Sequence, residues 1–141
     1  MTTASNESGK AAATGGCLCG AVRFAVSQPP PSMTLCHCAM CRRWHGHLGV
    51  YTSLPRAAIS IAGEEWLSWY ASSPGARRGF CVRCGSSLFW EEVEGSSRDI
   101  AAGAFDEPNA LALRAHIWAA HKGGYYAIAD ALPRFAESSA S

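Results

Sequence analysis

The 141-residue sequence lacks the features that would place it in a membrane or on nucleic acid. It has no apolar run of about eighteen residues, so we expect no transmembrane helix and no membrane partner. It has no marked excess of either charge, because twelve Lys and Arg stand against eleven Asp and Glu. Basic residues are scattered apart from the doublets at 42–43 and 77–78, which argues against nucleic acid as a partner.

Residues 1–16 lack a continuous apolar run and are rich in Ala, Ser, Thr and Gly. This composition predicts a disordered tail over residues 1–15 rather than a secretory or transit segment, and it favours a cytoplasmic location. The sequence also lacks repeats of solenoid length and an internal linker. We therefore expect one folded domain over residues 16–136, followed by a short C-terminal tail over residues 137–141.

Cysteine is present in an unusual pattern of seven residues in three clusters. The clusters are Cys17 and Cys19; Cys36, Cys38 and Cys41; and Cys81 and Cys84. A disulfide framework would leave one thiol over, would require strained bridges between cysteines two apart, and would need an oxidising compartment. The spacing instead favours metal thiolates, and zinc above other metals.

Seven ligands divide naturally into four and three, because a structural zinc takes four protein ligands and a catalytic zinc keeps three. The first and third clusters are each followed directly by glycine, which favours two similar half-sites sharing one zinc. This four-cysteine group is Cys17, Cys19, Cys81 and Cys84. The cysteine triad that remains is Cys36, Cys38 and Cys41. The alternative is a zinc ribbon of Cys38, Cys41, Cys81 and Cys84.

Period-two alternation of apolar residues predicts a mainly β architecture. Glycine, proline or serine marks the joints between the expected strands. Only two short helical turns are predicted, at residues 39–44 and 126–131, the second stopped by Pro133. The expected strands are 22–26, 33–36, 48–52, 58–61, 66–70, 78–81, 88–91, 99–102 and 113–118.

Four motifs together resemble the glutathione-dependent formaldehyde-activating enzyme (GFA) family, which also includes centromere protein V. They are the cysteine motifs at 16–24, 36–42 and 79–86 and the His-Ile-Trp motif at 116–118. The resemblance implies a β-tent fold of small antiparallel sheets stapled by zinc. It also implies a structural zinc on the four-cysteine group and a second zinc on the triad, open to a thiol such as glutathione. The chain departs from the family at Tyr125 and Tyr126, where members often carry tryptophan.

The chemistry of an open three-cysteine site agrees with that role. Zinc on three thiolates carries a net charge of minus one, so it is suited to holding another sulfur. A zinc-bound thiolate could add to an aldehyde, and in reverse it could leave as a C–S bond breaks. We therefore expect a zinc-dependent carbon–sulfur lyase acting on a thiol–aldehyde adduct. The alternative is a non-enzymatic protein-binding module in which zinc only staples the fold.

Polar residues near the triad are candidates for further roles. His45 and His47 follow the triad closely and would share a face of an extended chain, where either could carry a proton. Arg42 and Arg43 adjoin Cys41 and could offset its charge or hold substrate carboxylates. His37 alternates with two cysteines, so we expect its ring to point away from the metal and to be a buried structural histidine.

Overall fold

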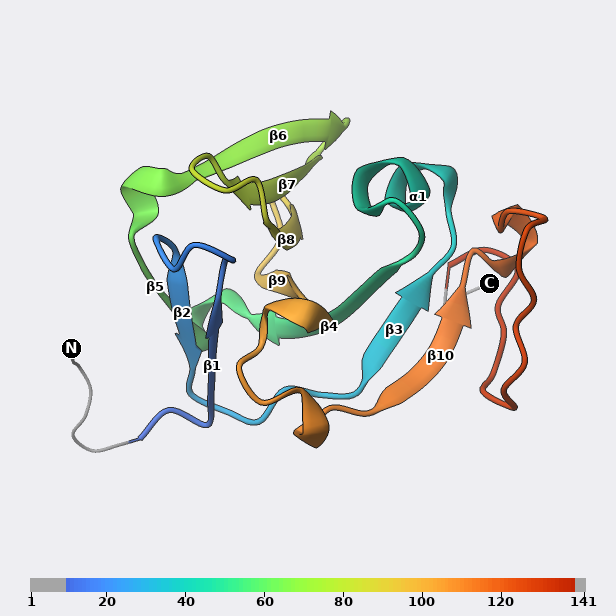
Figure 1. Cartoon of the computed structure of the whole chain (residues 1–141), viewed down its shortest axis with the longest axis horizontal. Coiled ribbons are helices and arrows are strands. Elements are labelled where there is room, and N and C mark those ends of the chain that lie inside the picture. The colour runs from blue at the N-terminus through green and yellow to red at the C-terminus, as the bar shows by residue number, and fades with distance from the viewer. Residues whose placement is uncertain (1–9, 139–141) are drawn as a thin grey trace.

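Two β-sheets form the framework of the computed structural model, which describes residues 10–138 (Figure 1). The smaller sheet has the order β1-β2-β5 and is antiparallel throughout. Its strands are β1 (Ala13–Gly16), β2 (Arg23–Val26) and β5 (Ile59–Ala62). In Figure 1 it lies at the left, away from the C-terminal segment.

The larger sheet has the order β10-β3-β4-β9-β8-β7-β6. Its neighbours pair antiparallel except β3 and β10, which pair parallel. The predicted mainly β fold of small antiparallel sheets is thus confirmed, with one parallel pair that the sequence pattern did not reveal. The strands are β3 (Met33–Cys36), β4 (Gly49–Pro55), β6 (Leu67–Ser73), β7 (Ala76–Cys81), β8 (Ser87–Glu92), β9 (Ser97–Ala101) and β10 (Leu113–Ile117).

Helical structure is limited to α1 (Ala39–His45) and five 3₁₀ turns within the described residues. The predicted turn at 39–44 is therefore confirmed as a short helix. No helix in residues 10–138 has the length and apolarity needed to cross a membrane. The 3₁₀ turns are Arg56–Ala58, Glu64–Trp66, Ala102–Ala104, Pro108–Ala110 and Ala119–His121.

The helical turn predicted at 126–131 is wrong, because this segment has no helical hydrogen bonding. Its carbonyl groups are used elsewhere: the Arg134 guanidinium donates to the Ile128 carbonyl at 2.8 Å and to the Asp130 carbonyl at 3.2 Å. The Arg134 side chain thus supplies the donors that main-chain N–H groups would supply in a helix.

The start of the folded domain also differs from the prediction, because β1 overlaps the expected disordered tail at residues 13–15. The small residues of β1 allow close packing against neighbouring segments and do not indicate disorder. A Cβ atom on Gly15 would lie 2.2 Å from the Ala104 carbonyl oxygen and 2.4 Å from the Phe24 ring, so only glycine fits. At the other end, the Glu137 carbonyl accepts a hydrogen bond from the Trp118 N–H. Residues 1–9 and 139–141 lie outside the described residues.

The hydrophobic core joins the two sheets. Phe24 of β2 packs edge-on against Phe89 of β8 and Phe105, with ring centroids 5.8 and 5.3 Å apart. Cys17 and Cys81 belong to the same buried cluster. The four-cysteine group therefore lies at the edge of the core, where the two sheets meet. The other fully buried apolar residues include Val22, Val26, Met33, Leu54, Leu88 and Ile100.

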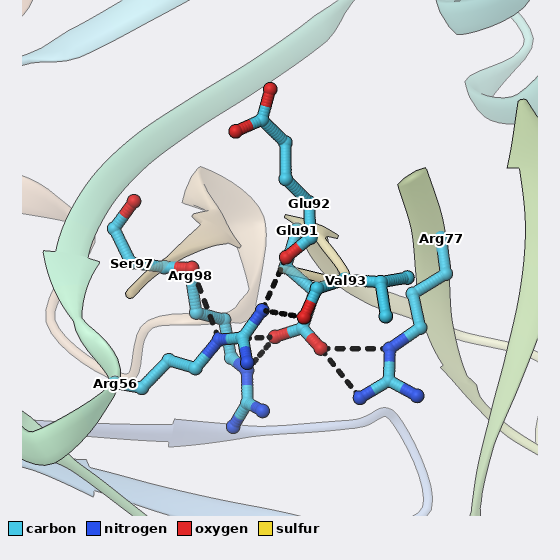
Figure 2. A network of polar contacts seen from close by, with 7 residues as sticks. All are labelled: Arg56, Arg77, Glu91, Glu92, Val93, Ser97 and Arg98. Atoms are coloured by element: carbon cyan, nitrogen blue, oxygen red, sulfur yellow. Dashed lines mark hydrogen bonds and ion pairs between the residues drawn. The ribbon is translucent and has the colours of Figure 1, made fainter. Parts of the chain in front are cut away.

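A buried carboxylate surrounded by three arginines lies on β8 (Figure 2). Glu91 is 1% exposed and accepts bonds from Arg77 Nε at 2.7 Å and Arg98 Nε at 2.6 Å. Arg56 Nε lies 3.3 Å from the same carboxylate. The Trp69 ring packs against Arg77 at 4.2 Å and Arg98 at 5.3 Å. Burial would raise the pKa of Glu91, but the bonds from Arg98 and Arg77 outweigh it and lower that pKa.

Replacing Glu91 with glutamine is expected to lower the free energy of unfolding by about 3–5 kcal/mol at pH 7, because it leaves three partly buried arginines without their fully buried counter-charge. The folded pKa of Glu91 is below its unfolded value, so the stabilisation is present at neutral pH and disappears as the pH falls through the folded pKa. The difference in the free energy of unfolding between the wild type and Glu91→Gln should therefore disappear at acidic pH. Urea unfolding at several pH values measures it.

The matched control is Glu92→Gln, since Glu92 is the next residue and is exposed. Its effect should stay within about 0.5 kcal/mol. Equal losses for the two variants would contradict the stabilising role of the Glu91 network.

Candidate metal centres and the adjoining pocket

The four-cysteine group is assembled as the four-plus-three division predicts. Its four Sγ atoms all lie within 4.8 Å of one another. The Cys17 and Cys19 sulfurs are 3.7 Å apart, and those of Cys19 and Cys81 are 3.8 Å apart. A tetrahedral metal with bonds of about 2.3 Å would hold its sulfur ligands about 3.8 Å apart. The spacing is far too long for a disulfide and fits a closed tetrahedral thiolate site.

Two similar backbone turns present these thiols. After β1, the Gly20 N–H donates to the Cys17 carbonyl at 3.2 Å, and Gly20 has a φ of 83°. After β7, the Gly85 N–H donates to the Cys81 carbonyl at 2.7 Å, and Gly85 has a φ of 84°. Only glycine adopts this left-handed conformation without strain. The glycine after each cluster thus has the role that the sequence indicated.

The cysteine triad forms a second group at the junction of β3 and α1. Cys36 ends β3, Cys38 is the N-cap of α1, and Cys41 lies in its first turns. The Cys38 sulfur accepts a bond from the Cys41 N–H at 3.3 Å. The three sulfurs lie within 4.8 Å of one another, and no fourth His, Cys, Asp or Glu of residues 10–138 joins the group. The alternative zinc ribbon, which divides these cysteines, is not formed.

The charges of the triad call for a cation. Hydrogen bonds from Cys36 and Cys41 lower the pKa of Cys38 to about 2. The same contacts raise the pKa of Cys36 far above its ordinary range, because a second thiolate would lie beside the first. Three thiolates can coexist here only with a positive charge between them. The donor set and its spacing therefore fit a metal ion that has three protein ligands.

A cavity of about 750 Å³ adjoins the triad, and all three of its cysteines line it. This volume is typical of a site for a small molecule. A row of side chains across the sheet lines another wall: Arg78 of β7 is paired in register with Trp90 of β8, which is paired with Asp99 of β9. Burial raises the pKa of Asp99 to about 6. Trp118, which follows β10, also lines the cavity.

The arginine whose side chain contacts the triad is not one that the sequence singled out as a substrate-binding residue. Arg78 is 3% exposed, and its Nη2 atom lies 3.7 Å from the Cys41 sulfur. Arg42 and Arg43, predicted to hold substrate, lie on α1, and neither lines the cavity. The doublet of Arg77 and Arg78 was the signal that could have found it, because successive residues of a strand face opposite sides, so one arginine of the pair must face the cavity side.

The two candidate histidines do not share a face. His45 ends α1, and its Nε2 atom lies 2.6 Å from the Tyr51 hydroxyl. Gly46, with a φ of 86°, then turns the chain, and the exposed His47 lies 2.6 Å from the Tyr125 hydroxyl. His45 lines a second cavity of about 770 Å³ instead of the triad's cavity. Burial lowers its pKa to about 4, so its ring is neutral at pH 7.

His37 is a buried histidine with both ring nitrogens satisfied, as expected. One nitrogen lies 2.6 Å from the Tyr126 hydroxyl, and the other lies 2.8 Å from His116. His116 in turn contacts the Asp130 carboxylate at 3.1 Å. Tyr126, one of the two departures from the family pattern, thus ties the C-terminal segment to the loop that carries the triad.

Known proteins resemble this chain over most of its length. Residues 12–121 match the sequence profile of the family described as "Glutathione-dependent formaldehyde-activating enzyme". An "Uncharacterized lyase" of Schizosaccharomyces pombe is 32% identical over 83 residues, which cover 59% of this chain and 60% of that protein. A "Putative glutathione-dependent formaldehyde-activating enzyme" of Halomonas elongata is 39% identical over 93 residues, covering 56% of this chain and 59% of that protein. The matches thus span about three fifths of these relatives.

A solved structure shares the fold. The crystal structure of a Rhodobacter sphaeroides protein superposes with a TM-score of 0.56 at 20% sequence identity. The superposition covers 66% of this chain and 87% of that chain. At this identity the likeness concerns the architecture alone.

Proposed function

We propose that this chain, which belongs to the glutathione-dependent formaldehyde-activating enzyme family, is a zinc-dependent carbon–sulfur lyase. Its substrate would be the adduct of a small thiol and an aldehyde, of the kind that glutathione forms with formaldehyde. The observation that carries the proposal is the unequal grouping of the seven thiols. Four form a closed group at the edge of the core, and three line a cavity.

The thiol set of the triad suits zinc, which prefers sulfur and nitrogen ligands. When bound there by Cys36, Cys38 and Cys41, zinc would supply a coordination position at which a substrate thiol ionises. The protein's own contribution is to hold the three sulfurs on β3 and α1 and to place a positive charge, that of Arg78, beside Cys41.

The cavity walls support proton transfer at the adduct. In the cleavage direction the hydroxyl group of the adduct loses its proton, the C–S bond breaks, and a thiolate and an aldehyde result. A carboxyl group with a pKa of about 6 can exchange that proton near neutral pH, and Asp99 lines the cavity. This favours Asp99 over His45 and His47, neither of which lines it. Trp90 and Trp118 add aromatic surface to the cavity wall.

The direct test is the exchange rate of S-hydroxymethylglutathione with its components, measured by NMR with zinc-loaded protein. We expect the rate to rise in proportion to protein concentration above the spontaneous reaction, which is itself fast enough to need subtraction. The same protein stripped of metal by a chelator is the control. An unchanged rate together with no binding of small thiols would refute the proposed activity.

A further inference from the structure

Arg78 is a buried cation whose guanidinium is only partly satisfied, by the Cys41 sulfur. It is 3% exposed, and its Nε and Nη1 atoms are buried and form no hydrogen bond with any described residue. No carboxylate of residues 10–138 forms an ion pair with it. Its neighbour Arg77, on the opposite face of β7, is paired with Glu91. Buried donors left without an acceptor are costly, so the two remaining nitrogens call for a further, anionic acceptor.

Asp99, which also lines the cavity, is not the anion that pairs with Arg78. Asp99 lies two strands away from Arg78 in the same row, and its pKa is raised by burial and by Glu92, opposed by a hydrogen bond from Ser53. An arginine partner would lower that pKa instead. The Cys41 sulfur contacts only the Nη2 atom of Arg78, at 3.7 Å. The other two nitrogens are buried and have no partner among the described residues, and the Arg78 side chain lines the cavity.

We propose that Arg78 binds a carboxylate carried by the substrate, so that the pocket selects anionic thiols or aldehydes over neutral ones. This inference rests on the proposed function, because it assumes that a thiol occupies the triad's cavity. Arginine suits this role because its planar guanidinium keeps its charge when buried and offers several donors to carboxylate oxygens. The contact of Arg78 with Cys41 places the carboxylate site close to the triad.

Two thiols that differ only in charge test the inference. Calorimetric titration of the zinc-loaded protein with 3-mercaptopropionate and with 3-mercaptopropanamide gives two dissociation constants. We expect the wild type to prefer the anionic thiol by about tenfold or more. Arg78→Met should reduce this preference by about 10- to 100-fold, and Arg78→Lys should retain part of it. Comparing variants by this ratio cancels the difference in thiol acidity between the probes.

Arg114→Met is the matched control, because Arg114 also lines the cavity but is exposed and bonds only to Thr34. Water screens its charge, so the preference should change by no more than about twofold. Zinc content and circular dichroism establish that each variant folds. If Arg78→Met does not fold, Arg78→Lys and the wild-type ratio still decide the question.

The outcomes separate the two proposals. Binding of neither thiol to the wild type would refute the proposed function, and this inference with it. Equal affinities of the wild type for both thiols would refute the inference alone. An equal loss of affinity for both thiols in Arg78→Met would also refute it, because Arg78 would then act only on the charge of the triad.

Discussion

Replacing Cys17 or Cys84 with serine is expected to unfold much of the domain. Structural zinc binding contributes on the order of 10 kcal/mol, which is comparable to the whole stability of a domain this size. Thermal unfolding followed by circular dichroism measures the loss, and metal analysis measures the zinc that each variant retains. The expected result is a broad or absent unfolding transition together with a loss of bound metal.

The location of these thiols explains the size of the effect. Cys17 follows β1 of the small sheet, and Cys84 follows β7 of the large sheet. A metal shared between them would therefore join the two sheets at the edge of the core, where Cys17 is 8% exposed and Cys81 is fully buried. Variants that keep a cooperative transition and their full metal content would contradict the structural role of the group.

Replacing Cys38 with serine should have the opposite outcome, with thiol binding abolished and the fold preserved. Cys38 is the N-cap of α1, where its sulfur accepts the Cys41 N–H. Serine is a favourable N-cap, so the substitution removes a metal ligand and keeps the cap. We expect the zinc content to fall from about two to about one per chain, and glutathione binding and adduct exchange to fall to background.

Cys38→Ala provides a control for the cap itself. It removes the same ligand and also the cap, so it should cost about 1 kcal/mol more stability than Cys38→Ser with the same loss of thiol binding. If Cys38→Ser unfolds the domain as fully as Cys17→Ser does, the assignment of a structural role to the four-cysteine group and a thiol-binding role to the triad is wrong. If it still accelerates adduct exchange, the reaction does not take place at the triad.

The cysteine groups were predictable because their chemistry is local. Each pair of the four-cysteine group is followed by Gly20 or Gly85, and these glycines adopt the positive φ that the turn requires. The triad is contained in residues 36–41, so its three sulfurs needed no long-range information to be brought together. Most strands were predictable for the same reason, since alternation of apolar residues is a property of neighbouring positions.

The pocket was not predictable because it depends on how strands pair. Arg78, Trp90 and Asp99 come from three strands, and only the register of β7, β8 and β9 places them in one row. The sequence showed Arg42 and Arg43 beside Cys41 but could not show that neither lines the cavity. His45 and His47 were misjudged as sharing a face because the helix ends at His45 and the chain turns at Gly46.

The parallel pairing of β3 with β10 has a consequence for the order of assembly. The triad's thiols are synthesised together at residues 36–41, whereas the β10 edge and Trp118 emerge from the ribosome only much later. Pairing of segments so distant along the chain is slow to form. During synthesis we therefore expect these thiols to spend a period without their finished surroundings, when early binding of a metal ion would protect them from oxidants.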